Sequence, residues 1–225
     1  MRNCIYIWLL AAFLFIGCAS AANHQKASHL LEAGIILVNN GEFDRALDEH
    51  NNAIRIAPDY PQAYNSRGNI YFLMGEFDRA IADYRKAIDL DPQYAKAYNN
   101  LGFAHFENNQ LENAIKDFSR AIIKNPRYAK AFNNRGLAYF AKGEYDRALL
   151  DYNRALELDP GLAKTYDNRG TIYMLLGEND MACSDFVRAC ELGECLTFEI
   201  VQDEGYCSVP HLAMTGSEKP HQLVF

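Results

Sequence analysis

The chain has 225 residues, a length that fits one domain or two small ones. It carries 22 Lys and Arg against 29 Asp and Glu, a net charge of −7. This argues against a general nucleic-acid-binding protein, because such proteins need excess cations to displace counterions from phosphates. With 49% hydrophobic and 23% charged residues, the composition is that of a folded chain rather than a disordered one.

The N-terminal residues form a secretory signal pattern. Positive charge at Arg2 is followed by a run from Ile5 to Ile16 in which every residue is apolar or aromatic. As a helix this run would rise about 18 Å, too little to cross about 30 Å of hydrocarbon, so it matches the core of a signal peptide. The run ends in Gly17 and Cys18, which resemble the lipobox of bacterial lipoproteins, although Phe15 stands where that family usually has Leu.

The lipobox resemblance implies that residues 1–17 are removed as a lipoprotein signal peptide and that residues 18–26 are a lipidated N-terminus and linker. In that family the cysteine, here Cys18, is acylated on its sulfur and on its new N-terminus. Ala19 after the cysteine resembles the sorting signal for the outer membrane, where the protein would face the periplasm. An inner-membrane anchor, an ordinary secretory signal cut slightly later and an uncleaved anchor stay open as alternatives.

A pattern with a period of 34 residues runs through most of the chain. Each of five copies holds one glycine and two alanines in constant register: Gly34, Gly68, Gly102, Gly136 and Gly170, then Ala46, Ala80, Ala114, Ala148 and Ala182, then Ala53, Ala87, Ala121, Ala155 and Ala189. Four copies close with a proline: Pro58, Pro92, Pro126 and Pro160. With aromatic residues at fixed steps from these ladders, the pattern resembles the tetratricopeptide repeat (TPR) family over residues 27–196.

This resemblance implies an all-α, right-handed superhelical solenoid of five helix-turn-helix repeats with a C-terminal capping helix. The segments expected are the repeats 27–60, 61–94, 95–128, 129–162 and 163–196, a capping helix at 197–207 and a flexible tail at 208–225. Hydrophobic periodicity independently predicts two amphipathic helices per repeat, for example Ala95–Glu107 and Leu111–Lys124. Gly75, Gly143 and Gly177 are expected to end the first helices, and the prolines to end the second ones.

Three repeats carry Arg at a position where the family often has Leu: Arg67, Arg135 and Arg169. An aspartate follows each of them sixteen residues later: Asp83, Asp151 and Asp185. We predict an Arg–Asp pair inside each of these repeats, with a structural role favoured over ligand binding.

Four cysteines lie in the last repeat and just beyond it: Cys183, Cys190, Cys195 and Cys207. In an exported protein an even, clustered set indicates disulfides, and without a C-x-x-C motif or a histidine at ligand spacing no zinc site is expected. If the capping helix folds back on the preceding helix, bridges 190–195 and 183–207 are favoured. The two other pairings stay open.

No motif of a hydrolase, metalloprotease, nucleotide-binding protein or haem protein occurs in the chain, so we expect no enzyme, no catalytic residue, no cofactor and no metal. His50 and His105 stand where other repeats carry aromatic residues, and we predict that both are packed in the core.

The TPR resemblance implies that the first helix of each repeat lines a concave groove. Positions that face this groove in the family carry amides and one carboxylate here: Asn65, Asn69, Asn99, Asn100, Asn133, Asn134, Asp167 and Asn168. An amide offers donors and an acceptor to an extended peptide. The pattern is similar to the asparagine ladder of the TPR superhelix in O-GlcNAc transferase.

The groove positions also carry two further sets of side chains. Lysines recur as Lys96, Lys130 and Lys164, and phenylalanines recur as Phe72, Phe106 and Phe140. The lysines favour an acidic ligand, whereas the phenylalanines either contact it or pack between repeats. The sequence therefore predicts a membrane-tethered adaptor that binds an extended segment of another envelope protein and no nucleic acid. A self-associating structural protein, for example a pilotin-like assembly factor, is the alternative.

Overall fold

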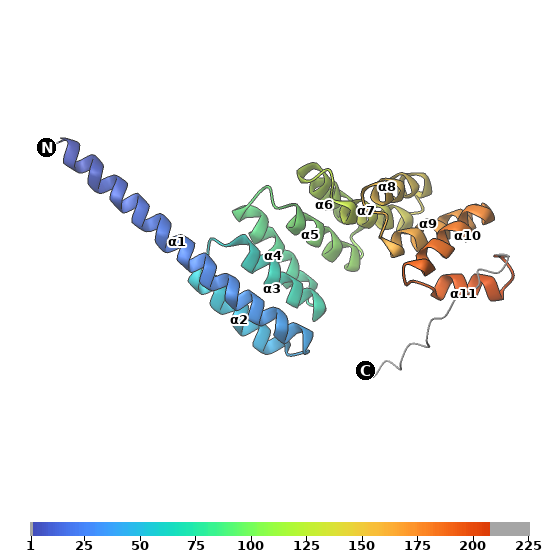
Figure 1. The fold of residues 1–225 in the computed structure, drawn as a ribbon, viewed down its shortest axis with the longest axis horizontal. Helices are drawn as coiled ribbons and strands as arrows, with labels where there is room; N and C mark the ends of the chain where they lie inside the picture. Colours follow the sequence, from blue (N-terminus) through green and yellow to red (C-terminus); the bar gives the residue numbers. More distant parts are fainter. Residues whose placement is uncertain (1, 208–225) are drawn as a thin grey trace. The chain divides into compact units, whose positions relative to one another are not determined.

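The computed structural model describes the backbone of residues 2–207 and the side chains of residues 20–207. Within residues 2–207 the chain forms eleven α helices and no strand (Figure 1), which confirms the predicted all-α fold. The helices are α1 (Arg2–Asn39), α2 (Phe43–Ile56), α3 (Pro61–Leu73), α4 (Phe77–Leu90), α5 (Ala95–Glu107), α6 (Leu111–Lys124), α7 (Ala129–Ala141), α8 (Tyr145–Leu158), α9 (Ala163–Leu175), α10 (Asn179–Glu191) and α11 (Leu196–Asp203).

The helices follow the 34-residue period. The bounds of α5 and α6 are those predicted for the third repeat. The second helices of the first four repeats each end two residues before a proline, because the proline ring cannot continue the helical hydrogen bonds: Pro58, Pro92, Pro126 and Pro160. After α3 the chain turns at Gly75, whose φ is 76°, and Asn109 takes the same left-handed conformation after α5 with a φ of 55°.

Glycine and alanine lie where the two helices of a repeat cross. A Cβ atom on Gly102 would lie 2.7 Å from a ring carbon of Phe118, and Ala114 and Ala121 have no exposed surface. The paired helices therefore approach closely, as the small residues predict.

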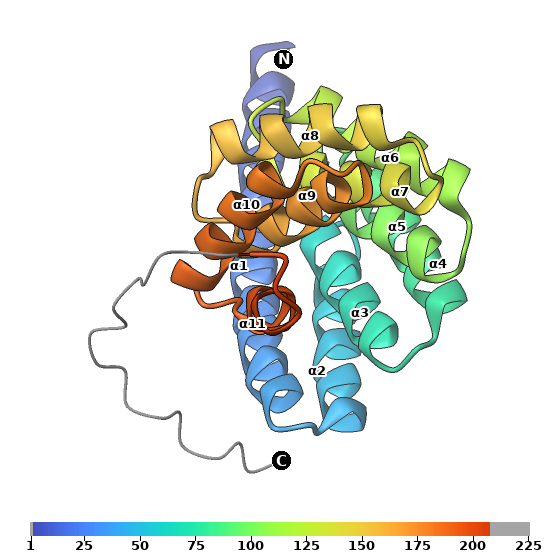
Figure 2. The same cartoon turned by 90° about the vertical axis from the view of Figure 1, so that its right-hand side faces the viewer.

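The chain divides into two compact units, residues 1–159 with α1–α8 and residues 160–225 with α9–α11. In the first unit the first helices of successive repeats, α1, α3, α5 and α7, contact one another in order. The second helices α2, α4 and α6 each contact their own first helix and the first helix of the next repeat, and α8 contacts its own first helix, α7. Figures 1 and 2 both show the C-terminal part of α1 lying beside α2, so the first repeat begins within this long helix.

Residues 18–26, expected to be a linker, are part of α1. No proline or glycine lies between Cys18 and Gly34, and this segment holds several strong helix formers, so nothing interrupts the helix. His24 stacks on Tyr60 with ring centroids 5.0 Å apart, and its Nε2 lies 3.0 Å from Asp59 Oδ1. These contacts attach the segment to the turn after α2. Among the described residues, no helix is both long and apolar enough to span a membrane.

In the second unit, α9 and α10 form the fifth repeat and α11 takes the place predicted for the capping helix. Phe198 and Val201 of α11 are buried in a cluster with Ala182 and Phe186 of α10. Because this cluster covers apolar surface of α10, α11 acts as the expected cap.

Two disulfides hold the end of the second unit. One joins Cys183 to Cys207, and the other joins Cys190 to Cys195 across the turn between α10 and α11. The pairing favoured from the sequence is confirmed. The predicted tail at residues 208–225 lies outside the described residues, as does the side chain of Cys18.

Candidate functional site

Amide side chains connect the first helices of the first unit. Asn100 on α5 donates both amide hydrogens to α3, to Asn65 Oδ1 and to Asn69 Oδ1, each at 3.0 Å. Asn134 on α7 donates to Asn99 Oδ1 on α5, also at 3.0 Å. These contacts cross from one repeat to the next. We call the faces of α3, α5 and α7 that carry them the first-helix surface.

The amides of this surface differ in their access to solvent. Asn65 and Asn99 are only 2% and 7% exposed, and their side-chain carbonyl oxygens accept the hydrogen bonds described above. Asn69, Asn100 and Asn134 are half-buried. The amide NH₂ of Asn69 has no hydrogen-bond partner within residues 20–207, so it is available to a ligand. The amides thus join repeats, while their ligand role stays a prediction.

The remaining polar groove candidates lie on α5, α7 and α9. Asn133 Nδ2 donates to Asn134 Oδ1 at 3.1 Å. Lys96 and Lys130 are exposed at equivalent places on α5 and α7 of the first unit. On α9, in the second unit, Lys164 is exposed with its Nζ 4.0 Å from Glu194 Oε1, and its neighbours Asp167 and Asn168 are half-buried.

The phenylalanines of the groove positions are half-buried among other aromatic rings. Phe72 lies 5.3 Å from Phe103 of the next repeat, and Phe106 stacks on Phe103 at 6.3 Å between centroids. Phe140 lies 5.8 Å from Tyr145 at the start of α8. The packing role considered for these side chains is therefore present, and ligand contact stays a prediction.

The three predicted Arg–Asp pairs are confirmed. Arg67, Arg135 and Arg169 each donate from Nε and Nη2 to the two carboxylate oxygens of their aspartates, at 2.7–2.8 Å. The hydrogen bond to Asp83 raises the pKa of Arg67 above its usual value, although burial opposes the shift. Because the carboxylates are buried and both their oxygens are bonded, these pairs hold the two helices of a repeat together.

The two histidines at aromatic positions are buried, as predicted. His50 Nδ1 hydrogen-bonds Ala46 O at 2.8 Å, and burial lowers the pKa of His50 below its usual 6.5. His105 Nδ1 lies 2.8 Å from Asp117 Oδ2. The described part of the chain holds no group of three side chains suited to a metal ion.

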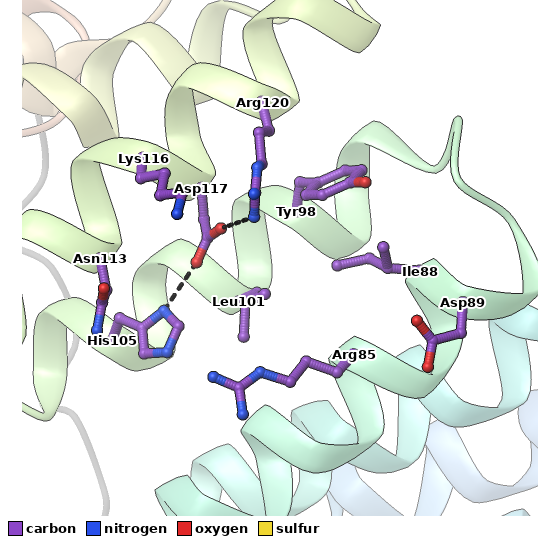
Figure 3. A pocket seen from close by; sticks show the side chains of 10 residues that line it. All are labelled: Arg85, Ile88, Asp89, Tyr98, Leu101, His105, Asn113, Lys116, Asp117 and Arg120. Carbon is purple, nitrogen blue, oxygen red and sulfur yellow. Dashed lines mark hydrogen bonds and ion pairs between the residues drawn. The ribbon is translucent and has the colours of Figure 1, made fainter.

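A pocket of about 380 Å³, formed mostly by the third repeat together with the second helix of the second repeat, was not predicted from the sequence (Figure 3). It is lined by α4, α5 and α6, and we call it the third-repeat pocket: Arg85, Ile88, Asp89, Tyr98, Leu101, His105, Asn113, Lys116, Asp117 and Arg120. The sequence feature that could have indicated the pocket is Leu101, which stands where three other repeats have Arg.

Stacked helix pairs with polar side chains aligned along their first helices define the class of helical-repeat interaction scaffolds. A TPR repeat profile matches residues 34–75, 68–109 and 104–143, and tetratricopeptide repeat profiles match residues 129–162 and 163–192. The chain belongs to the tetratricopeptide repeat family. None of these profiles describes a catalytic domain.

Solved structures show the same fold. The chain is 31% identical to MamA, covering 72% of this chain and 94% of that one with a TM-score of 0.62. The first TPR of Spaghetti (RPAP3), solved with the HSP90 peptide SRMEEVD, is 32% identical, with 52% and 94% of the two chains covered and a TM-score of 0.51. Pseudomonas aeruginosa pilF shares the fold at 18% identity, with 82% and 88% covered and a TM-score of 0.73. No curated protein sequence matches the chain.

Proposed function

We propose that this protein is a membrane-anchored adaptor of the bacterial cell envelope whose first-helix surface binds an extended, acidic segment of a partner protein. The observation that carries the proposal is the row of amides across α3, α5 and α7, flanked by the exposed Lys96 and Lys130. An extended peptide needs donors and acceptors at regular intervals, and amides supply both. Lysines beside them favour acidic side chains.

The similarity to the first TPR of Spaghetti (RPAP3) supports a peptide ligand. The peptide in that structure, SRMEEVD, holds two glutamates and one aspartate. Envelope placement is supported by the signal pattern and by Cys18, whose acylation would provide the anchor. Several acyl chains, each methylene contributing about 0.8 kcal/mol, would hold the protein on an outer membrane almost permanently.

The amides are tested by crosslinked pull-down from envelopes with the full chain. Asn100→Ala with Asn134→Ala is expected to lose the partners that the unaltered protein recovers. The control is Asn39→Ala with Asn40→Ala at the exposed end of α1. If both variants recovered every partner equally, binding at the first-helix surface would be contradicted.

The lysines provide a second test, because reversing exposed charges leaves the amide bonds between repeats intact. We expect the triple reversal to glutamate to weaken partner binding several-fold, mostly through the association rate, with a smaller loss at high salt: Lys96, Lys130 and Lys164. A control applies the same charge change to exposed cations of second helices: Arg55, Lys86 and Arg154. A folded triple variant with unchanged affinity at low salt would contradict an acidic ligand.

Self-association is the second candidate function. Ile123 on α6 and Leu150 on α8 are 73% and 70% exposed, and an exposed apolar side chain on a second helix suits contact between copies. Light scattering of the full chain in detergent separates the two functions. A stable oligomer that dissociates with Ile123→Lys and Leu150→Lys would favour the structural role over the adaptor.

A further inference from the structure

The Arg–Asp pairs follow a spacing rule that extends beyond one repeat. Arg67 contacts Asp83, sixteen residues later, and also Asn51 Oδ1, sixteen residues earlier, at 2.7 Å. Arg135 repeats this arrangement with Asp151 and with Ser119 Oγ at 3.0 Å. Each guanidinium therefore lies between two successive second helices and bonds to both: α2 and α4 for Arg67, and α6 and α8 for Arg135.

The third repeat breaks this rule at Leu101. Its residue sixteen positions later is still an aspartate, Asp117, but no arginine reaches it from α5. Instead Asp117 bonds to His105 Nδ1 at 2.8 Å and to Arg120 Nη1 at 3.1 Å. Because a carboxylate only accepts hydrogen bonds, His105 Nδ1 carries the hydrogen. The buried carboxylate thus has both oxygens bonded without a cation at position 101.

The residue sixteen positions before Leu101 is also unusual. It is Arg85, a cation. The residues sixteen positions before Arg67 and Arg135 are instead the neutral acceptors Asn51 and Ser119. Figure 3 shows the Arg85 guanidinium extending from α4 across the pocket toward His105 and away from Asp89. The third-repeat pocket occupies the space that a guanidinium fills in the second and fourth repeats.

Cations without partners line one end of this pocket. Arg85 enters from α4, and Lys116 enters from α6 on the opposite side (Figure 3). Within residues 20–207 neither has an ion-pair partner or a side-chain hydrogen bond. Ile88, Tyr98 and Leu101 form the apolar part of the wall. The rest is polar and includes two carboxylates, the exposed Asp89 and the buried Asp117, whose two oxygens are already hydrogen-bonded. Unpaired cations close to apolar side chains favour an anion with an apolar part.

This pocket is separate from the first-helix surface. Tyr98, Leu101 and His105 line the pocket, whereas Asn99 and Asn100 bond to α7 and α3. The two sets lie on different faces of α5, so a ligand in one does not need the other.

We propose that the third-repeat pocket binds a carboxylate carried on a small apolar body, such as the C-terminal residue of a peptide. The planar guanidinium of Arg85 matches a carboxylate with two parallel hydrogen bonds, and Lys116 adds a second positive charge. A volume of about 380 Å³ lies at the lower end of the range for small-ligand sites, enough for one amino-acid residue. This site is additional to the binding at the first-helix surface proposed above.

The test is NMR titration of the full chain in detergent, following the side-chain signals of Arg85 and His105. The probes are N-acetyl-leucine, its neutral analogue N-acetyl-leucinamide, and inorganic phosphate. We expect N-acetyl-leucine to bind, and the amide to bind at least tenfold more weakly. Arg85→Ala and Lys116→Ala are each expected to reduce the affinity about tenfold, the lower end for a charge-assisted bond. Lys86→Ala, an exposed cation of α4 outside the lining, serves as the control.

A second variant uses the chain's own pattern to close the pocket. Leu101→Arg with Arg85→Ser recreates the arrangement of Arg135, Asp151 and Ser119, so it should abolish N-acetyl-leucine binding without loss of thermal stability. The proposal is overturned if the unaltered protein does not bind N-acetyl-leucine, or if phosphate binds as tightly. Unchanged binding in Arg85→Ala, or in the folded double variant, would overturn it equally.

Discussion

Tyr84 and Tyr152 occupy the same position in the second and fourth repeats, yet only one hydroxyl has a partner. Tyr84 donates to Asn69 Oδ1 at 2.8 Å, whereas the buried Tyr152 hydroxyl has no hydrogen-bond partner within the described residues. The residue equivalent to Asn69 in the fourth repeat is Leu137, which offers no acceptor. Burial raises the pKa of both phenols, so both hydroxyls keep their protons at neutral pH.

We therefore expect opposite effects from one substitution at the two sites. Tyr84→Phe removes a hydrogen bond and should lower the free energy of unfolding by about 0.5–1.5 kcal/mol. Tyr152→Phe removes an unpaired buried hydroxyl and should raise it by about 1 kcal/mol. Urea unfolding followed by circular dichroism measures both. Equal destabilisation by the two substitutions would show that the Tyr152 hydroxyl finds a partner.

His50 should make stability depend on pH. Burial lowers its pKa in the folded protein, with a smaller contribution from the charge of Arg67, and the bond to Ala46 O and the charge of Glu49 oppose the shift. The unfolded chain then binds the proton more readily than the folded one. The contribution of His50 to the free energy of unfolding is complete above about pH 6.5 and declines as the pH falls through the lowered pKa of the folded state.

The substitution His50→Phe tests this dependence, because the equivalent residue of the third repeat is a phenylalanine, Phe118. The variant should lose less stability than the unaltered protein when the pH falls from 7.5 to 5.5 in thermal unfolding experiments. His29→Gln, at an exposed site on α1, is the matched control. An unchanged pH dependence in His50→Phe would assign the effect to other groups.

At the scale of the helix pair, stability depends on the close crossing at the glycine ladder. A Cβ atom on Gly102 would meet Phe118 Cδ1 at 2.7 Å and Ala114 O at 3.1 Å. Gly102→Ala gains up to about 1 kcal/mol of helix propensity, but overpacking of a core costs about 1–3 kcal/mol. We therefore expect a net loss of about 1 kcal/mol in denaturant unfolding.

A double-mutant cycle separates this clash from a general effect of alanine. Phe118→Leu should cost less in the Gly102→Ala background than in the unaltered protein, because the smaller side chain relieves the contact. Such coupling is expected for residues that touch. Strictly additive effects would mean that the helices move apart instead.

The disulfides stabilise the α10–α11 element to different extents. The Cys183–Cys207 bridge closes a loop with a sequence separation of 24, and the Cys190–Cys195 bridge one with a separation of 5. Replacing both cysteines of a bridge by alanine should therefore cost about 3 kcal/mol for the first and about 2 kcal/mol for the second. Amide hydrogen exchange on α11 reports the losses. A larger loss from the short bridge would contradict the loop-entropy explanation.

For the whole molecule, the proposed membrane anchor is tested at Cys18. Cys18→Ser should release the protein into the soluble fraction or leave an unprocessed precursor, because serine cannot form the thioether-linked lipid. Fractionation of cells and the mass of the protein distinguish these products. Cys4→Ser, inside the predicted signal peptide, should leave processing and membrane attachment unchanged. A processed, membrane-bound Cys18→Ser protein would show that this cysteine is not the anchor.

Much of the architecture follows from the sequence, because the residues that determine it repeat every 34 positions. The period predicts the helices, their closing prolines and their close crossings, and a separation of sixteen within one repeat predicts the Arg67–Asp83 pair and its equivalents. The disulfide pairing followed from a turn between two adjacent helices. All these contacts join residues near each other along the chain, where helix geometry fixes which side chains meet.

Contacts between repeats were decided by the tertiary structure alone. The burial of Asn65 and Asn99 depends on how α3, α5 and α7 stack, and Asn100, the residue after Asn99, is only half-buried. The third-repeat pocket depends on Arg85 and Leu101 meeting across two repeats, each residue being ordinary in its own helix. The stacking of helix pairs brings such residues together, because no pair can bury its apolar face alone and each must use its neighbour to do so.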